Sequence, residues 1–463
     1  MTTTTLIHVS YLVSAILFIL CLQQLSSPRS ARRGNLLGAI GMLLACAVTL
    51  LDQQILSPIT IVAGLLVGAI IGVLFAQRTR MTSMPQLVAV LNGFGGGASA
   101  LVAAGEFVRQ TQLGAEPTLE SSISIAVGGA IGAITFSGSI VAFAKLQELM
   151  SGRPVKFHLQ QPLNLLLLLA TVMFATALAV APSYLWLFLV LAITFVLGIS
   201  VVVRIGGADM PVVISLLNSL SGIAGAAAGF IVNNTILIIA GTLVGASGLI
   251  LTQIMSKAMN RPIANILFSG FGGHKTAGQL GAQEDRTVRS VSAADAATVL
   301  GYARSVIFVP GYGLAVAQAQ HNVAELAKIL EARGAVVKFA IHPVAGRMPG
   351  HMNILLAEAN ISYEKLFDLD QINDEFQQTD IAVVIGANDV TNPDARDKAE
   401  SPLYGMPILN VDHARNILVL KRSMGSGFAG VENPLFYNEK TMMLFGDAKK
   451  SVQALVSEVK ALD

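Results

Sequence analysis

The chain has 463 residues, of which 53% are hydrophobic and only 13% charged, and its mean hydropathy is +0.66. This composition excludes an ordinary soluble protein. The net charge of +2 hides an asymmetry: residues 1–260 carry 11 Lys/Arg against 6 Asp/Glu, and the remaining residues carry 19 against 22. We therefore expect a transmembrane domain over 1–260, a linker over 261–300 and a soluble domain over 301–463.

Nine apolar segments follow one another through the first part. Each is roughly 20 residues long, the length that crosses about 30 Å of hydrocarbon. The first lacks a basic region and a convincing cleavage site, so we interpret it as a retained helix and not a signal peptide. The predicted spans lie near 4–22, 34–51, 55–76, 83–105, 120–145, 162–181, 184–203, 210–231 and 234–257.

Basic residues gather in alternate loops between these segments. The opposite set of loops offers only Arg109. By the positive-inside rule this places the N-terminus outside and the soluble domain in the cytoplasm, which an odd number of spans requires. The basic loops contain Arg29, Arg32 and Arg33, then Arg78 and Arg80, then Lys145, Arg153 and Lys156, then Arg204, and finally Lys257 and Arg261.

Polar but uncharged residues occur inside several spans. Asn92, Ser139 and Asn218, with Thr135 and Ser215 nearby in sequence, are the residues of interest. Polar groups are costly in the bilayer, so they face the bundle interior, where they could hold water for a proton path. Ordinary hydrogen bonding between helices is the alternative for each residue.

Asp209 stands just before Pro211 at the start of the eighth span. It could cap that helix, because an aspartate accepts from the first free N–H groups. The alternative is a role at the cytoplasmic mouth of the membrane domain.

Cys21 and Cys46 both lie in apolar segments, so the cysteines indicate neither a disulfide framework nor a metal site.

Strand and helix patterns alternate in the second part. This alternation predicts a soluble α/β, Rossmann-like domain with a doubly wound parallel sheet, following the polytopic α-helical membrane domain. Its slightly acidic charge argues against nucleic acid as a partner. The predicted elements are a strand at 305–309, a helix at 315–333, a strand at 336–341, a helix at 352–359, strands at 381–386 and 416–421, and a helix at 448–461.

The segment Gly311-Tyr312-Gly313 follows the first predicted strand and opens a helix. This is the context of a dinucleotide fingerprint, and we expect its amides to point at a phosphate. Val316 replaces the third glycine of the motif.

Two further features indicate NADP(H) and not NAD(H). The second strand ends in Ala340-Ile341-His342-Pro343, without the acid that usually holds an NAD ribose. Lys421, Arg422 and Ser423 end a later strand, where they could grip an extra phosphate. A solvated strand end is the alternative interpretation of these three residues.

Several long stretches match one family. The chain resembles the beta subunit of proton-translocating NAD(P) transhydrogenase over essentially its whole length. The stretches are IGGADMPVVISLLNS (205–219), PGYGLAVAQAQ (310–320), IHPVAGRMPGHMNILLAEA (341–359), VIGANDVTNP (384–393), KRSMGSGFAGVENPLF (421–436) and FGDAK (445–449).

The resemblance implies that the soluble domain binds NADP(H), in an orientation reversed relative to ordinary dinucleotide folds. Asp389 would approach the nicotinamide, and Asp209 would take part in coupling. A lid from Ser423 to Gly430 would close over the cofactor. The implied cofactor-binding residues are Gly311, Tyr312, Gly313, Val316, Val344, Ala345, Gly346, Arg347, Met348, Pro349, Gly386, Ala387, Asn388, Asp389, Val390, Lys421, Arg422, Ser423, Met424, Gly425, Phe428, Gly430, Asp447 and Ala448.

The chain departs from the family pattern at two positions. Asn92 stands in VAVLNGFGG, where the best-known form has a histidine, so this residue cannot change charge with a proton. Either the titrating group comes from another helix of a partner subunit, or water held by Asn92, Ser139 and Asn218 carries the proton. Phe428 stands where many relatives have tyrosine, so no hydroxyl contact is expected there.

The expected function is hydride transfer from NADH to NADP⁺, coupled to inward proton movement across the bacterial inner membrane. One dinucleotide site means that NAD(H) belongs to an alpha subunit, which we expect to bring further transmembrane helices, in a dimer of protomers within membrane lipid. No protein nucleophile is expected, since direct hydride transfer needs positioning more than acid–base groups. The alternative function is an ion transporter or channel gated by a cytosolic dinucleotide-sensing domain.

Overall fold

The structure is a computed structural model that describes residues 3–27, 29–52, 58–80, 83–114, 117–152, 154–155, 157–269, 287–427 and 429–462. The chain folds as two compact units, residues 1–206 with 213–252, and residues 207–212 with 253–463. Five parts of the sequence predictions lie outside the described residues: residues 55–57 of the third predicted span, Arg153, Lys156, Phe428, and residues 270–286 of the predicted linker.

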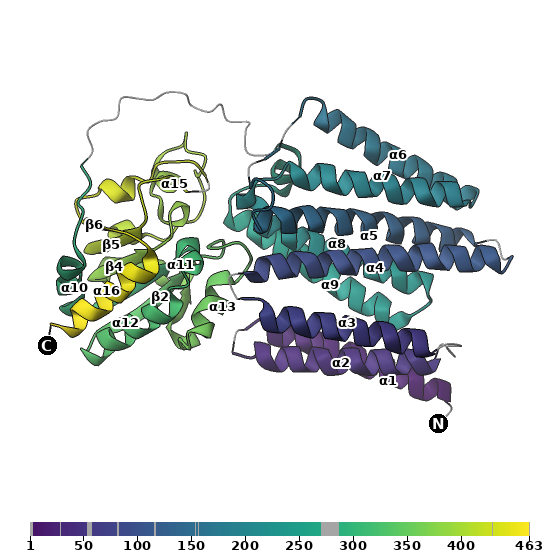
Figure 1. Ribbon diagram of the computed structural model, residues 1–463, viewed down its shortest axis with the longest axis horizontal. Coiled ribbons are helices and arrows are strands. Elements are labelled where there is room, and N and C mark those ends of the chain that lie inside the picture. The colour runs from purple at the N-terminus through teal and green to yellow at the C-terminus, as the bar shows by residue number, and fades with distance from the viewer. Residues whose placement is uncertain are drawn as a thin grey trace. The chain divides into compact units, whose positions relative to one another are not determined.

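Within the described residues, nine helices are long and apolar enough to cross a membrane, which confirms the nine predicted spans. Their ends fall within three residues of the predicted ones, except that α4 ends at Gln112 and not near 105. Helix α4 continues through Glu106 and Arg109, which form an ion pair on it. The helices, labelled in Figure 1, are α1 (Thr3–Leu25), α2 (Ala31–Asp52), α3 (Pro58–Arg78), α4 (Met84–Gln112), α5 (Leu119–Leu146), α6 (Gln160–Val180), α7 (Tyr184–Val203), α8 (Met210–Ile231) and α9 (Thr235–Ala258).

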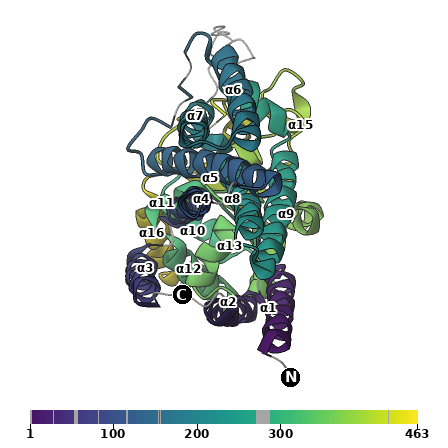
Figure 2. The ribbon, with the colours of Figure 1, turned by 90° about the vertical axis from the view of Figure 1, so that its right-hand side faces the viewer.

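Helix α5 is the most buried of the nine and packs against both α4 and α7. Figure 2 shows α4, α5 and α8 close together. Gly96 of α4 lies against Gly132 of α5 so closely that a Cβ on Gly132 would be 2.5 Å from the Gly96 carbonyl oxygen. Small residues allow this approach, which replaces the hydrophobic driving force that helices lack in lipid.

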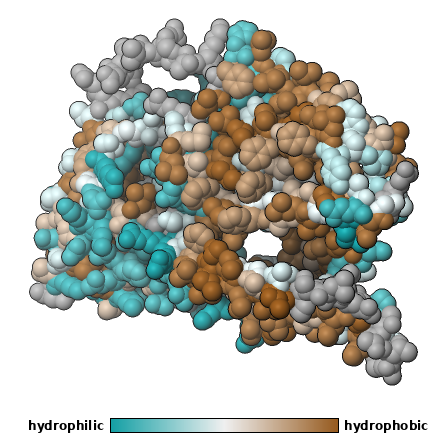
Figure 3. Space-filling view, turned by 45° about the vertical axis from the view of Figure 1, so that its right-hand side comes forward, coloured by the Kyte–Doolittle hydropathy of each residue, from teal (hydrophilic) through white to brown (hydrophobic). Residues whose placement is uncertain are grey.

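The outer surface of the helical part is apolar. Large hydrophobic side chains such as Leu43, Leu101 and Leu166 are more than half exposed, and Figure 3 shows a broad hydrophobic surface over the helices. Exposed apolar area of this extent is expected where lipid, and not water, surrounds the protein.

The second unit contains a six-stranded parallel sheet in the order β3-β2-β1-β4-β5-β6, which confirms the predicted fold class. The chain winds outward from β1 in one direction and from β4 in the other, so its switch point lies between these two strands. The strands are β1 (Ser305–Pro310), β2 (Val336–Ile341), β3 (Leu366–Asp368), β4 (Ile381–Ile385), β5 (Asn416–Lys421) and β6 (Thr441–Phe445).

Alternate residues of β1 enter two different cores. Val306 and Phe308 join the core under α10, α12 and α16, while Ile307 and Val309 join the core on the opposite face. Both faces are covered, which explains why the central strands are continuous apolar runs. The remaining α-helices are α10 (Ala293–Gly301), α11 (Tyr312–Ala317), α12 (Gln320–Ala332), α13 (His351–Glu358), α14 (Leu369–Ile372), α15 (Asp394–Asp397) and α16 (Ala448–Lys460).

Several local features differ from the sequence predictions, among them the short helices α14 and α15, which were not predicted. The helix predicted over 315–333 is two helices, α11 and α12, because Gln318 adopts a left-handed conformation with φ of 51°. Residues 293–301 of the predicted linker form α10, which begins with a capping box between Ser292 and Asp295. Strands β3 and β6 were not predicted; β3 has only three residues, too few to show periodicity.

Candidate functional site

The loops that follow β1 and β4 touch each other at the switch point of the sheet. A Cβ on Gly311 would lie 2.4 Å from the backbone of Ala387. Gly386 has φ of +67°, and a Cβ there would lie 2.4 Å from the Cα of Gly313. No side chain fits between these two loops, so glycine is required at these positions for the backbones to form one floor.

The N–H groups of Gly311 and Gly313 are both used within the protein, which differs from the expectation that the amides of the Gly-x-Gly motif point at a phosphate. The N–H of Gly311 donates to the carbonyl of Ile385 at 2.9 Å, and the N–H of Gly313 donates to Gly386 at 3.0 Å. In an ordinary fingerprint these donors would hold a pyrophosphate. Here they join the two loops, and α11 is only six residues long.

A groove runs along this edge of the sheet in two connected parts. The part nearer β5 has a volume of about 240 Å³ and is lined by Val316, Lys421, Arg422 and Ala448. The other part is lined by Tyr312, Val344, Ala345, Gly346, Asp389 and Val390. Both parts share the floor and one wall, formed by Gly313, Gly386, Ala387, Asn388, Ser426 and Gly427.

Two cations stand at the end of β5. The ammonium of Lys421 donates to the carbonyl of Gly425 and lies 4.4 Å from the ring centroid of Phe436. Arg422 is mostly exposed and pairs with Asp447, with 3.2 Å between Nη2 and Oδ2. Burial lowers the pKa of Lys421, and the charge of Asp389 acts in the opposite direction. Positive charge is therefore concentrated where the groove meets the start of α16.

The loop after β2 is organised around two buried histidines. His342 lies 2.7 Å, through Nε2, from the Pro407 carbonyl and accepts at Nδ1 from the N–H of Val344. His351 accepts at Nδ1 from the N–H of Arg347 at 3.0 Å. Burial lowers the pKa of both histidines to about 4, with the charge of Arg347 adding to the effect on His351. Both side chains are therefore neutral at physiological pH.

Arg347 lies over the ring of Tyr312, with 4.4 Å between Cζ and the ring centroid. Tyr312 lines the groove, so this stacking brings a guanidinium beside the groove from the loop after β2. The structure therefore gathers cations at two separate places along the groove, Arg347 on the β2 side and Lys421 with Arg422 on the β5 side.

The carboxylate of Asp389 faces the segment we expected to form a lid, residues 423–430. Its Oδ2 accepts from the N–H of Ala429 at 2.9 Å. A Cβ on Gly427 would lie 2.3 Å from Oδ1, so the backbone of the lid rests on this carboxylate. Gly430 ends the segment with φ of +71°.

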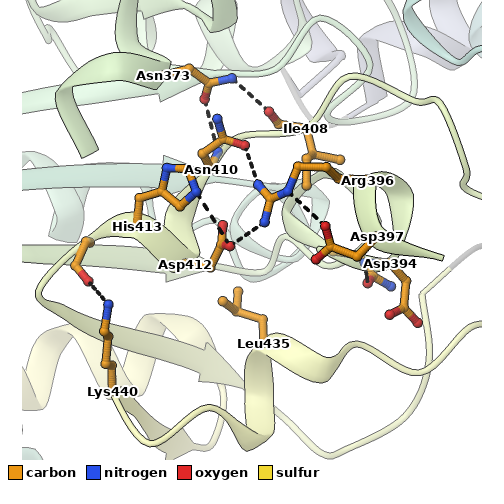
Figure 4. Close-up of polar contacts among 12 residues, drawn as sticks. Asn373, Asp394, Arg396, Asp397, Ile408, Asn410, Asp412, His413, Leu435 and Lys440 are labelled. Atoms are coloured by element: carbon orange, nitrogen blue, oxygen red, sulfur yellow. Dashed lines mark hydrogen bonds and ion pairs between the residues drawn. The ribbon is translucent and has the colours of Figure 1, made fainter. Parts of the chain in front are cut away.

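The segment between α15 and β5 forms a further wall of the groove through Pro402, Leu403 and Met406. It is fixed by the network in Figure 4, in which Arg396 donates to Asn410 at 2.9 Å and pairs with Asp412. This segment was not predicted to lie at the site. Its position after β4 was the available signal, because loops after parallel strands gather at one edge of the sheet.

Most residues that the resemblance implied come together at this groove. Asp447 does not line it, but it caps α16 by accepting from the N–H groups of Lys449 and Lys450. The expected residues that line neither part of the groove are Arg347, Met348, Pro349, Ser423, Met424, Gly425, Gly430 and Asp447.

In the helical unit, the proposed proton-path residues lie on α4, α5 and α8. Asn92 donates to the carbonyl of Ile214 at 3.3 Å, so its amide joins α4 to α8. Ser139 is fully buried, and a Cβ on Gly93 would lie 3.2 Å from its Cβ. Within the described residues, the hydroxyls of Ser139 and Ser215 have no hydrogen-bond partner. Asn218 is half-buried on α8.

Asp209 is fully buried and pairs with Arg261 through Oδ1. Its Oδ2 has no hydrogen-bond partner among the residues that the structure describes. Burial raises the pKa of this carboxyl, while the hydrogen bond and charge of Arg261 act against that effect. The ion pair joins the start of α8 to the chain just after α9.

The family model described as NAD(P) transhydrogenase beta subunit matches residues 7–458. The chain belongs to this family. It is 50% identical over 461 residues to an NAD(P) transhydrogenase subunit beta of Rhodospirillum rubrum, an alignment that covers 98% of this chain and 99% of the relative. A second subunit beta, from a named strain of the same organism, matches to the same extent.

The family and the nine apolar helices identify the chain as a multi-pass membrane subunit of a transhydrogenase, an oxidoreductase that uses NADP. A beta subunit has an alpha subunit as its partner in the complex. The resemblance inferred from the sequence motifs is thereby confirmed.

Proposed function

We propose that the C-terminal domain of this transhydrogenase subunit, residues 301–463, binds NADP(H) in the groove at the carboxyl edge of its sheet. The glycine contact between Gly311, Gly313 and Gly386 supports this most strongly, since it leaves an open backbone floor at the switch point. When bound, NADP⁺ supplies a nicotinamide ring that accepts a hydride, and NADPH returns it.

The chain's own groups divide the work along the groove. Lys421 and Arg422 hold the 2′-phosphate through charge-assisted hydrogen bonds. Arg347, which stacks on Tyr312, binds the charge of the pyrophosphate. The N–H groups of Gly311 and Gly313 already donate to backbone carbonyls, which suits a cofactor bound in the reversed orientation. Asp389 positions the lid near the nicotinamide, and the lid excludes water from the transfer.

The membrane helices carry protons inward, in this proposal, along a path through Ser139 and Asn218, with Asn92 fixing α4 against α8. The buried hydroxyls of Ser139 and Ser215 are available as ligands for water. Asp209 couples the inner mouth to the soluble domain, and its ion pair with Arg261 is an element that a charge change could open.

The whole complex contains an alpha subunit that holds NAD(H) and brings further transmembrane helices. Hydride would pass directly between the bound NADH and NADP⁺, with the Re/Si specificity of the family. The protomers form a dimer in the bacterial inner membrane, with the N-terminus outside and the soluble domain in the cytoplasm. The alternation of basic loops supports this orientation.

Reconstitution of the purified chain in vesicles, with and without its alpha subunit, tests this function. With the partner we expect NADH to reduce NADP⁺ while the vesicle interior changes pH. The chain alone should bind NADPH and give no sustained turnover. Turnover by the chain alone would contradict the division of cofactors, and ion flux gated by NADPH without hydride transfer would favour a channel.

A further inference from the structure

Two buried asparagines connect the loop after β4 with the base of the lid. Asn433 is 2% exposed and Asn392 is fully buried. Asn433 follows the lid in sequence, and Asn392 follows Asp389 in the loop after β4. The two residues therefore lie on opposite sides of the contact between the lid base and this loop. Neither was among the residues we expected to matter from the sequence.

Asn433 uses both ends of its amide. Its Nδ2 donates to the backbone carbonyl of Asn388 at 3.0 Å and contacts the side-chain oxygen of Asn388 at 3.2 Å. Its Oδ1 accepts from the N–H of Leu435 at 3.0 Å. The side chain is therefore fixed by its own segment and donates to the loop beside Asp389.

Asn392 makes the reciprocal connection. Its Nδ2 donates to the backbone carbonyl of Glu432 at 3.1 Å, and its Oδ1 accepts from the N–H of Asp394 at 3.0 Å. Each asparagine thus donates across the gap and accepts within its own segment. Only an amide side chain of this length offers a donor and an acceptor in this arrangement.

The carbonyl of Asn388 is a shared acceptor. Besides Asn433, it accepts from the N–H of Thr391 at 3.1 Å and from the hydroxyl of Thr391 at 3.0 Å. The next residue, Asp389, accepts from the N–H of Ala429 in the lid. The loop after β4 and the chain from residue 429 to 433 are therefore joined at three points.

We propose that Asn392 and Asn433, the asparagine pair, are positioning residues that make the base of the lid and the Asp389 loop move as one body. Opening of the lid then withdraws Asp389, and closing restores it beside the bound ring. This inference rests on the proposed function, because it assumes that NADP(H) occupies the groove.

The test uses the complete transhydrogenase complex in detergent, with Asn433→Asp as the main variant. An aspartate keeps the shape and the acceptor for Leu435 but loses the donor to Asn388. Asn438→Asp is the matched control, since Asn438 accepts from the N–H of Lys440, a role that aspartate retains. Asn392→Asp is the second variant, and it keeps the test valid if Asn433→Asp does not fold.

The readouts are the release rate of NADPH during a chase with NADP⁺, the steady-state kinetics and the melting curve. We expect Asn433→Asp and Asn392→Asp each to release NADPH roughly tenfold faster, the effect of one lost hydrogen bond. The kcat of hydride transfer should fall while the KM for NADH stays near that of the unchanged complex. The melting temperature should also fall, because the new carboxylate faces a buried carbonyl oxygen. Asn438→Asp should leave all of these unchanged.

Two results would overturn the inference alone: normal NADPH release in both variants, or an equal acceleration in Asn438→Asp. If the unchanged complex does not bind NADPH, the proposed function fails and this inference fails with it. The unchanged complex is therefore measured first, and the two failures remain distinguishable.

Discussion

Arg422 donates to Asp447, with 3.2 Å between the guanidinium Nη2 and the carboxylate Oδ2. Asp447 is itself fixed, because it accepts from the N–H groups at the start of α16. The pair joins the end of β5 to the turn after β6 and keeps a guanidinium beside the groove. A carboxylate that holds Arg422 in position competes with any phosphate for the same donors, so the arginine must be shared or exchanged on binding.

The first prediction concerns cofactor selectivity. Arg422→Ala should weaken NADPH binding roughly tenfold to a hundredfold, since hydrogen bonds to charged groups contribute about 1.5–3 kcal/mol. NADH lacks the 2′-phosphate, so its affinity should stay the same. Binding of both cofactors to the solubilised complex is the measurement.

The control for this prediction is Arg415→Ala. Arg415 immediately precedes β5, whereas Arg422 immediately follows it. Arg415 forms a comparably exposed ion pair with Asp380, with 3.0 Å between Nη1 and Oδ1. This variant should bind NADPH normally. An equal loss of NADPH and NADH affinity in Arg422→Ala would show that Arg422 does not read the extra phosphate.

The second prediction concerns the glycine floor. Gly386→Ala should destabilise the soluble domain by about 1–2 kcal/mol from its left-handed backbone, plus about 1–3 kcal/mol from overpacking against Gly313. Gly334→Ala is the matched control, because Gly334 also has positive φ, +90°, but open space around it. Only the backbone cost applies there. Denaturation of the two variants should separate them, and equal costs would contradict a tight contact at Gly386.

The third prediction concerns pH. His342 and His351 have pKa values lowered to about 4 in the folded protein, against an ordinary value of 6.5. As pH falls, these histidines bind protons in the unfolded chain before they do so in the folded protein. Their contribution to the free energy of unfolding is therefore complete above about pH 7 and is lost between about pH 6.5 and 4. Each histidine should account for up to about 3 kcal/mol of that loss.

Unfolding measured from pH 7.5 to 4.5 checks this expectation. His342→Gln should reduce the slope of stability against pH, since it removes one titrating group. The exposed residue His321 on α12 provides the control, and His321→Gln should leave the slope nearly unchanged. A slope in His342→Gln as steep as that of the unchanged protein would contradict a buried neutral His342.

The fourth prediction concerns the membrane path. Asn218→Leu should abolish proton pumping while NADPH binding stays normal, because leucine removes the polar group from the interior of α8. Pumping is measured in vesicles as a change in internal pH during hydride transfer. Ser247→Ala on α9 serves as the control, because the Ser247 hydroxyl donates to the Val244 carbonyl of its own helix. Normal pumping in Asn218→Leu would return Asn218 to a packing role.

The ends of the membrane helices were predictable from the sequence to within three residues, apart from the C-terminal end of α4. A span needs roughly 20 apolar residues whatever its neighbours are, so local composition specifies it. The central strands β1, β2, β4 and β5 were predictable for a similar reason, since strands covered on both faces are apolar throughout. The edge strand β3 was not predictable, because its three residues carry little periodicity. Strand β6 was also missed, although it is five residues long like β4.

The sequence by itself determined which part of the chain lies in the membrane and which part lies in water. It also determined the class of the soluble fold and, through its long motifs, the family. Tertiary structure alone decided how the donors and acceptors of the site are used. The Gly311-Tyr312-Gly313 turn has the sequence of a phosphate-binding loop, yet its amides bind the loop after β4. Asn392 and Asn433 stand inside stretches that match the family, yet no local pattern shows that folding brings their segments together. Hydrogen-bond partners distant in sequence leave no local pattern, so only the folded chain specifies them.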